Sequence, residues 1–219
     1  MIRSFQKVFL AVAALCVLAT SAGAVTMPDA AVNPPLAKAG ATAQSIVLAG
    51  GCFWGVEGVF QHLKGVKNVI SGYAGGEAAT AKYGEVSTGT TGHAEAVQIT
   101  YDPAQITLGE ILKVYFFEAH NPTQLNMQGP DHGTQYRSNI FYSTAEQKDV
   151  AEAYIKQLDT AKAFDGKIVT RVDPLKAFYA AEDHHQDFMK KNPMHPYIVI
   201  HDAPKVASFK KDLPALYRD

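Results

Sequence analysis

The chain has 219 residues, of which 47% are apolar and 19% charged, the ordinary balance of a soluble globular protein. This composition excludes a disordered, a collagen-like or a coiled-coil chain. Twenty Lys and Arg residues against 21 Asp and Glu residues give a net charge of −1, so we expect no binding to nucleic acid or to an anionic membrane. Two cysteines in the whole chain exclude a disulfide scaffold.

Residues 1–24 have the features of a secretory signal peptide. Arg3 and Lys7 precede an apolar run, Val8 to Ala19, and small residues follow that run. A membrane anchor is the alternative, but the run is well short of the roughly 20 residues that span a bilayer as a helix. We therefore expect cleavage after Ala24 and a periplasmic or secreted protein that does not stay in the membrane.

Cleavage would remove Cys16 and leave Cys52 as the sole cysteine of the mature chain. A sole cysteine forms no internal disulfide, so its presence in an exported protein needs another explanation. Residues 25–44 are rich in Ala and Pro and show no hydrophobic periodicity, which predicts a flexible linker. One folded domain is then expected over residues 45–219.

Apolar runs and apolar residues at helical spacing predict the elements of this domain. In chain order these are a strand at 46–49, a helix at 52–63, strands at 66–73 and 94–101, a helix at 108–116, a strand at 139–142, a helix from Ser143 or Thr144 to about Ala163, a strand at 168–172 and a short helix at 182–191. The remainder, to about Tyr217, is expected to be irregular. The predicted fold class is α+β, a two-layer ferredoxin-like βαββαβ core with a mixed sheet and long irregular C-terminal additions.

Cys52 is the first candidate for chemistry, because it follows a strand and two glycines and begins a helix. Unpaired backbone N–H groups and the helix dipole at such a position favour the thiolate. Phe53 and Trp54 place two aromatic rings beside the sulfur. From position alone, a reactive thiol and a small buried apolar residue are equally good interpretations.

The segment GGCFWGVE at 50–57 resembles the signature of the peptide methionine sulfoxide reductases of the A type. Further segments agree and follow the family's order: GYAGG at 72–76, YGEV at 83–86, TGHAEAV at 91–97, GPDHGTQYRS at 129–138 and AEDHHQ at 181–186. The resemblance covers residues 46–193. It implies an enzyme that reduces the S epimer of free and protein-bound methionine sulfoxide.

The same resemblance implies the roles of the matching residues. Cys52 is the nucleophile, giving methionine and a Cys52 sulfenic acid. Glu95 protonates the sulfoxide oxygen, which requires that burial raise its pKa. Tyr83 and Tyr136 donate hydrogen bonds to that oxygen. Without the motifs, Glu95 reads as a solvated strand residue and the two tyrosines as ordinary loop residues.

Three more residues are implied for substrate binding. Phe53 and Trp54 form the apolar wall that takes the substrate's methyl group, and Asp131 orders the site through hydrogen bonds. Asp131 alone could equally be a turn residue before Gly133. We expect no cofactor and no metal ion, because the chain lacks the spacings C-x-x-C and H-E-x-x-H and adjacent histidines such as His184 and His185 point about 100° apart on a helix.

The chain departs from the family in lacking a second cysteine that could reduce the sulfenic acid. The C-terminal part has none, and Ser87 stands where some members have a cysteine. We therefore expect an external thiol reductant, either a thioredoxin-like protein or a small thiol, and a monomeric enzyme.

Two other function classes compete with this interpretation. A cysteine hydrolase would need a histidine paired with Cys52 and would depend little on Glu95. A non-catalytic module that binds oxidised methionine would need Phe53 and Trp54 but would still work with serine at position 52.

Overall fold

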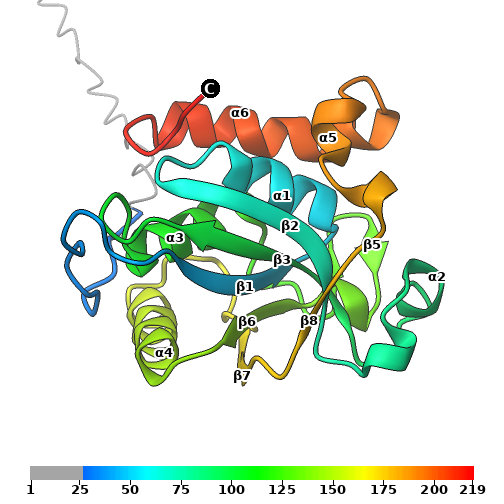
Figure 1. The fold of residues 1–219 in the computed structure, drawn as a ribbon, viewed down its shortest axis with the longest axis horizontal. Helices are drawn as coiled ribbons and strands as arrows, with labels where there is room; N and C mark the ends of the chain where they lie inside the picture. Colours follow the sequence, from blue (N-terminus) through cyan, green and yellow to red (C-terminus); the bar gives the residue numbers. More distant parts are fainter. Residues whose placement is uncertain (1–26) are drawn as a thin grey trace, which may run out of the picture.

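The computed structural model describes residues 27–219, so the predicted signal peptide at 1–24 lies outside the described residues. Six strands form one sheet: β1 (Gln44–Gly50), β2 (Val66–Ala74), β3 (Ala94–Tyr101), β6 (Ser138–Tyr142), β7 (Arg171–Pro174) and β8 (Phe178–Ala180). Their order is β7-β6-β1-β3-β2-β8 (Figure 1). The four central strands are antiparallel, while β7 pairs with β6 in parallel, which makes the sheet mixed.

This architecture confirms the predicted α+β class, since the order β6-β1-β3-β2 is that of a ferredoxin-like core. The main helices are α1 (Phe53–Gln61), α3 (Leu108–Val114, continued by a π-helical turn η2 at Tyr115–Ala119) and α4 (Ala145–Thr160). Short elements fill the connections: η1 (Ala78–Thr80), α2 (Tyr83–Val86), the two-stranded ribbon of β4 (Met127–Gln128) and β5 (Asp131–His132), and η3 (Thr134–Tyr136).

The helices begin where their sequences supply caps. The Thr107 side chain accepts a hydrogen bond from the backbone N–H of Glu110, and the Glu110 carboxylate accepts one from the backbone N–H of Thr107, which completes a capping box for α3. Thr144 caps α4 in the same position through the N–H of Gln147. The apolar side of α1, with Val56, Val59 and Phe60 fully buried, packs on the sheet and contributes to the main core.

The C-terminal part is more regular than expected. The segment 182–191 is two short elements, η4 (Asp183–His185) and α5 (Phe188–Lys191), because Asp187 between them has a positive φ of 55°. A π-helical turn η5 (Ile198–Asp202) and the helix α6 (Ala203–Asp212) follow, and α6 lies along α1 (Figure 1). Only Phe209 of α6 is fully buried, so the sequence carries too sparse an apolar period to predict this helix.

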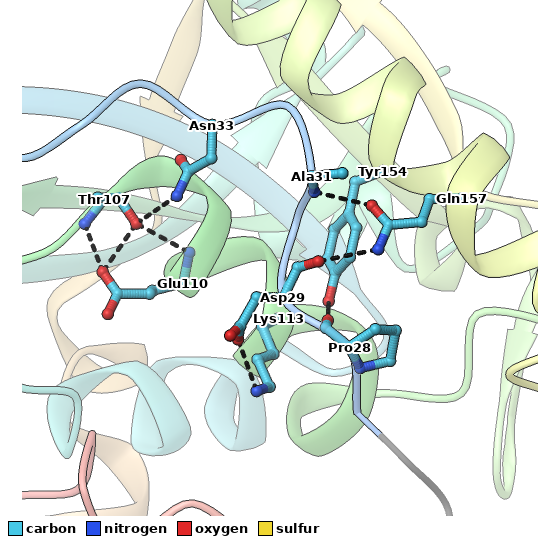
Figure 2. Close-up of polar contacts among 9 residues, drawn as sticks. All are labelled: Pro28, Asp29, Ala31, Asn33, Thr107, Glu110, Lys113, Tyr154 and Gln157. Atoms are coloured by element: carbon cyan, nitrogen blue, oxygen red, sulfur yellow. Dashed lines mark hydrogen bonds and ion pairs between the residues drawn. The ribbon is translucent and has the colours of Figure 1, made fainter.

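Residues 28–37 also differ from the flexible linker that their composition predicts. This N-terminal strap lies on α3 and α4, and its partners are 66 to 128 residues away in the chain, beyond the reach of local sequence patterns (Figure 2). Its hydrogen bonds and one ion pair join Tyr154 Oη to the Pro28 carbonyl, Lys113 Nζ to Asp29 at 2.8 Å, Ala31 N–H to Gln157 at 2.8 Å, Asn33 to Thr107 and Gly109 at 2.9 Å each, and Ala37 N–H to the Pro103 carbonyl at 2.8 Å.

Within residues 27–219, no helix is both long and apolar enough to cross a membrane.

Candidate active site

Cys52 lies at the junction between β1 and α1, where it is the N-cap residue of the helix and 9% exposed. Gly51 before it has a φ of +91°, and a Cβ there would lie 2.6 Å from the side chain of Gln128. Only glycine fits this turn, both by its backbone conformation and by the close approach of the loop that carries Gln128. The sulfur is thus held at a strand-to-helix turn.

The protonation of Cys52 differs from the expectation drawn from its helix position. Burial raises the pKa of the thiol well above its ordinary value, and the carboxylates of Glu95, Asp202 and Asp131 raise it further. The backbone N–H of Trp54 lowers it, as a helix start should, but by less than burial raises it. The resting site therefore holds a thiol rather than a thiolate.

Glu95 lies on β3 and is almost fully buried. Its Oε2 accepts a hydrogen bond of 3.1 Å from the backbone N–H of Phe53, the residue after Cys52. Burial raises the pKa of Glu95 to about 8, with smaller increases from Asp131 and Asp202 and a decrease from the Phe53 N–H. A carboxylic acid that keeps its proton at neutral pH can donate that proton, as the sequence interpretation requires.

Tyr83 on α2 and Tyr136 on η3 are half-buried beside these groups. Burial raises the pKa of both phenols, and the charges of Glu95, Cys52 and Asp131 raise both further. Both side chains consequently remain O–H donors at physiological pH. The structure thus brings together the thiol, the acid and the two hydrogen-bond donors from four separate segments.

Phe53 and Trp54 form an aromatic wall at the start of α1. The Trp54 ring stacks on Phe188 with centroids 3.7 Å apart and an interplanar angle of 10°, and Tyr197 meets it edge-on at 5.9 Å. The indole N–H donates to Nδ1 of His185 at 3.2 Å. These contacts fix the orientation of the indole ring.

Asp131 on β5 joins the loop region to the C-terminal part, since its Oδ2 accepts a hydrogen bond from the Tyr197 hydroxyl. Its charge also contributes to the raised pKa of Cys52 and Glu95. Asp131 is therefore at the site, beyond any role in a turn.

Several residues that support the site were not predicted from the sequence. Glu182 accepts hydrogen bonds from Tyr73 Oη at 2.8 Å and from the backbone N–H of Tyr83 at 2.9 Å, so it holds α2 against β2. The matching segment at 181–186 contains Glu182 and His185, and their presence there was a usable signal. Nothing in the sequence pointed to Phe188 or Tyr197.

The histidines do not gather around a metal position. Among residues 27–219, no three His, Cys, Asp or Glu side chains lie close enough to hold a metal ion. His185 is instead buried against Phe53 and Tyr83, with ring centroids at 5.2 Å and 4.4 Å, while His184 beside it is exposed.

The arrangement combines a buried thiol, a neutral carboxylic acid, two phenol donors and an apolar wall. A family model described as peptide methionine sulfoxide reductase matches residues 44–215. The chain belongs to this family.

Two curated relatives, both named peptide methionine sulfoxide reductase MsrA 2, support the A type. The protein from Mesorhizobium japonicum is 57% identical over 182 residues, which cover 83% of this chain and 93% of the relative. The protein from Synechocystis sp. is 53% identical over 184 residues, covering 84% and 86%.

Solved structures of the family share the fold. The reduced form of Mxr1 from Saccharomyces cerevisiae has a TM-score of 0.62 and 36% identity, covering 73% of this chain and 91% of that one. Methionine sulfoxide reductase A of Corynebacterium diphtheriae has a TM-score of 0.61 and 37% identity, covering 77% and 82%. This methionine sulfoxide reductase is accordingly an oxidoreductase.

Proposed function

We propose that this reductase acts on the S epimer of free and protein-bound methionine sulfoxide through attack by Cys52. The observation that carries the mechanism is the placement of Glu95, whose pKa burial raises to about 8, against the N–H of Phe53 next to Cys52. A thiol nucleophile and a neutral acid in one buried site are what the reaction needs. The Cys52 thiolate attacks the substrate sulfur while Glu95 gives its proton to the sulfoxide oxygen.

Tyr83 and Tyr136 are proposed to donate hydrogen bonds to the same oxygen as negative charge develops on it. Phe53 and Trp54 are proposed to receive the methyl group, so the oxygen and the methyl group have fixed positions and only one epimer presents its sulfur to Cys52. The oxygen leaves the substrate sulfur and becomes bonded to Sγ. The sulfoxide is thus reduced by two electrons, and the thiol is oxidised to a sulfenic acid.

We propose that an external reductant completes the cycle, because the described chain holds Cys52 as its free thiol and the sequence offers no second cysteine outside the predicted signal peptide. A first external thiol forms a mixed disulfide with Cys52 and releases water, and a second thiol then releases Cys52. A thioredoxin-like dithiol supplies both sulfurs in one protein, whereas a small thiol is consumed twice.

Export is a further part of the proposal and depends on the sequence of residues 1–24. We propose that the signal peptide is removed after Ala24 and that the mature monomer works in the periplasm or outside the cell. N-terminal sequencing of the protein recovered from a cell envelope fraction would test both the site of cleavage and the location.

The experiment that tests the reaction is a single turnover of each epimer of a blocked methionine sulfoxide without any reductant. We expect one equivalent of methionine from the S epimer, none from the R epimer, and a gain of about 16 Da on the peptide that contains Cys52. Reduction of neither epimer by a folded protein with a free thiol would contradict the proposal.

Two variants separate the reductase from its competitors. Cys52→Ser should abolish turnover, whereas a binding module would keep its function. Glu95→Gln should slow the first turnover by roughly 10²–10⁴-fold, whereas a cysteine hydrolase would be little affected.

A further inference from the structure

The C-terminal part places an ion pair in the interior next to α1. Asp202, the last residue of η5, is fully buried, and its Oδ1 lies 3.1 Å from Nζ of Lys205 on α6. Its Oδ2 has no hydrogen-bond partner within the part of the chain that the structure describes. A fully buried carboxylate with one unpartnered oxygen is unusual in a core, and nothing in the proposed reaction uses it.

This pair rests directly on the first turn of α1. A Cβ built on Gly55 would lie 2.1 Å from Asp202 Oδ1 and 3.0 Å from Lys205 Nζ. Gly55 is three residues after Cys52, and glycine weakens a helix wherever it is not needed. The close approach of Asp202 and Lys205 explains why the helix that Cys52 begins carries a glycine at this position.

The charges around the pair come from several elements. The groups whose charges act on Asp202, or on which its charge acts, are Cys52 at the N-cap of α1, Glu95 on β3, Asp131 on β5, Tyr197 at the N-cap of η5, His201 on η5 and Lys205 on α6. The charge of Asp202 raises the pKa of both Cys52 and Glu95. Burial raises the pKa of Asp202 itself, and the neighbouring cation of Lys205 offsets part of this increase.

We propose that Asp202 and Lys205 are positioning residues for Cys52. The pair holds the first turn of α1 in place and sets the balance of charge in which the thiol loses its proton. Neither residue touches the substrate. The inference rests on the proposed role of Cys52 as the nucleophile, and its test uses a reaction of the thiol that does not involve methionine sulfoxide.

The test is the rate of alkylation of Cys52 by iodoacetamide between pH 7 and pH 11, followed by mass spectrometry of the Cys52 peptide in the full chain. Asp202→Asn removes the negative charge and leaves Lys205, so the midpoint of the profile should fall, by on the order of 0.5 pH unit. Lys205→Met leaves the Asp202 carboxylate without its cation. The midpoint of this variant should therefore rise.

The double variant should return the midpoint close to that of the unmodified protein, since both charges are gone. A purely structural role would shift both single variants in the same direction through loosened packing. Lys210→Met is the matched control, because Lys210 lies on the same helix and pairs with Asp219 at 2.7 Å on the surface. Its midpoint should not change.

An unchanged midpoint in a folded Asp202→Asn protein, or shifts of both single variants in one direction, would overturn the proposal. Circular dichroism and a thermal melt establish folding for each variant. If Asp202→Asn does not fold, the partly exposed Lys205 still provides a test, since a Lys205→Met midpoint that stays or falls would also reject the role. If the unmodified protein reduced no methionine sulfoxide while the variants shifted the alkylation midpoint as expected, the proposed function would be rejected and this inference would stand.

Discussion

Cys52 and Glu95 share one buried site but need opposite protonation states for the proposed reaction. Burial raises both pKa values, which keeps the proton that Glu95 must give and hinders the loss of the proton from Cys52. The site therefore favours the protonated form of both groups. Charges close to Cys52, and not only its position at the helix start, determine how readily the thiolate forms.

The pH dependence of the first turnover follows from Glu95. The Cys52 thiol must lose its proton and Glu95 must keep its own, so the rate should rise with pH below about 8, the pKa of Glu95 in the folded protein, and stop rising above it. Quenched-flow measurement of methionine formation from pH 6 to pH 10 would show this break. The Glu95→Gln protein should lack it, and a variant that kept the same break would assign it to another group.

Glu57 on α1 gives a prediction about stability rather than activity. Burial raises its pKa from 4.5 to about 7, and its Oε2 has no hydrogen-bond partner among residues 27–219. Because the pKa of Glu57 is higher in the folded state than in the unfolded state, its contribution to the free energy of unfolding is fully present below about pH 4.5. That contribution is lost as the pH rises through about 7. Glu57→Gln should therefore raise the free energy of unfolding at pH 8 by about 1–3 kcal/mol.

Urea unfolding of the Glu57→Gln protein at pH 5 and pH 8 checks this dependence. The gain should be small at pH 5, where the native glutamate is largely protonated in the folded state. An equal gain at both pH values would show that packing, and not the charge of Glu57, sets the effect.

The start of α3 shows how one element depends on a distant segment. Thr107 caps the helix through the N–H of Glu110, and its Oγ1 also accepts a hydrogen bond of 2.9 Å from Asn33 of the N-terminal strap. Thr144, the cap of α4, accepts only from the N–H of Gln147 within the described contacts. Both threonines accept a hydrogen bond from the third backbone N–H of their helix, but only Thr107 also contacts the strap and completes a capping box.

We therefore expect Thr107→Ala to cost about 1–2 kcal/mol of unfolding free energy and Thr144→Ala about 1 kcal/mol. A double-mutant cycle of Asn33→Ala with Thr107→Ala should give a coupling energy of at least about 0.5 kcal/mol. The same cycle of Asn33→Ala with Thr144→Ala is the control and should give none. Additive losses at Asn33 and Thr107 would mean that the strap does not support the cap.

The sequence predicted the elements whose signals are local. The strands around β1 and β3 and the cap of α4 were recognisable because apolar spacing and Thr144 stand in the segment itself. The helix α6 was not recognisable, because Phe209 is its only fully buried residue. The strap was not recognisable either, because the hydrogen-bond partners of Asn33 are 74 and 76 residues away in the chain. The motifs predicted Cys52 and Glu95 as site residues. They did not predict Tyr197, which contacts Asp131 only in the folded chain.

At the level of the whole molecule, the strap makes the domain larger than its family motifs suggest. It covers Lys113, whose side chain is only 14% exposed, and the hydroxyl of the buried Tyr154. Removing the strap would leave both groups, and Gln157, without these partners. None of the hydrogen bonds of the strap involves a residue proposed for catalysis.

A chain that begins at residue 38 should consequently be less stable by about 2–4 kcal/mol than one that begins at residue 25, since several hydrogen bonds are lost. For a domain of this size that corresponds to a fall in Tm of about 5–12 °C. Thermal melts of the two chains measure the difference. The first-turnover rate at 25 °C should be the same in both, and a large loss of rate would connect the strap to the site.

The C-terminal 23 residues, 197–219, complete the surroundings of the thiol. Tyr197 binds Asp131 and borders Trp54, Asp202 rests on Gly55, and Tyr217 bridges to Leu63 at the other end of α1. On the ribosome, the strands and helices that precede residue 197 can associate while residues 197–219 are still in the exit tunnel. The surroundings of the Cys52 thiol are therefore complete only after residues 197–219 have left the tunnel.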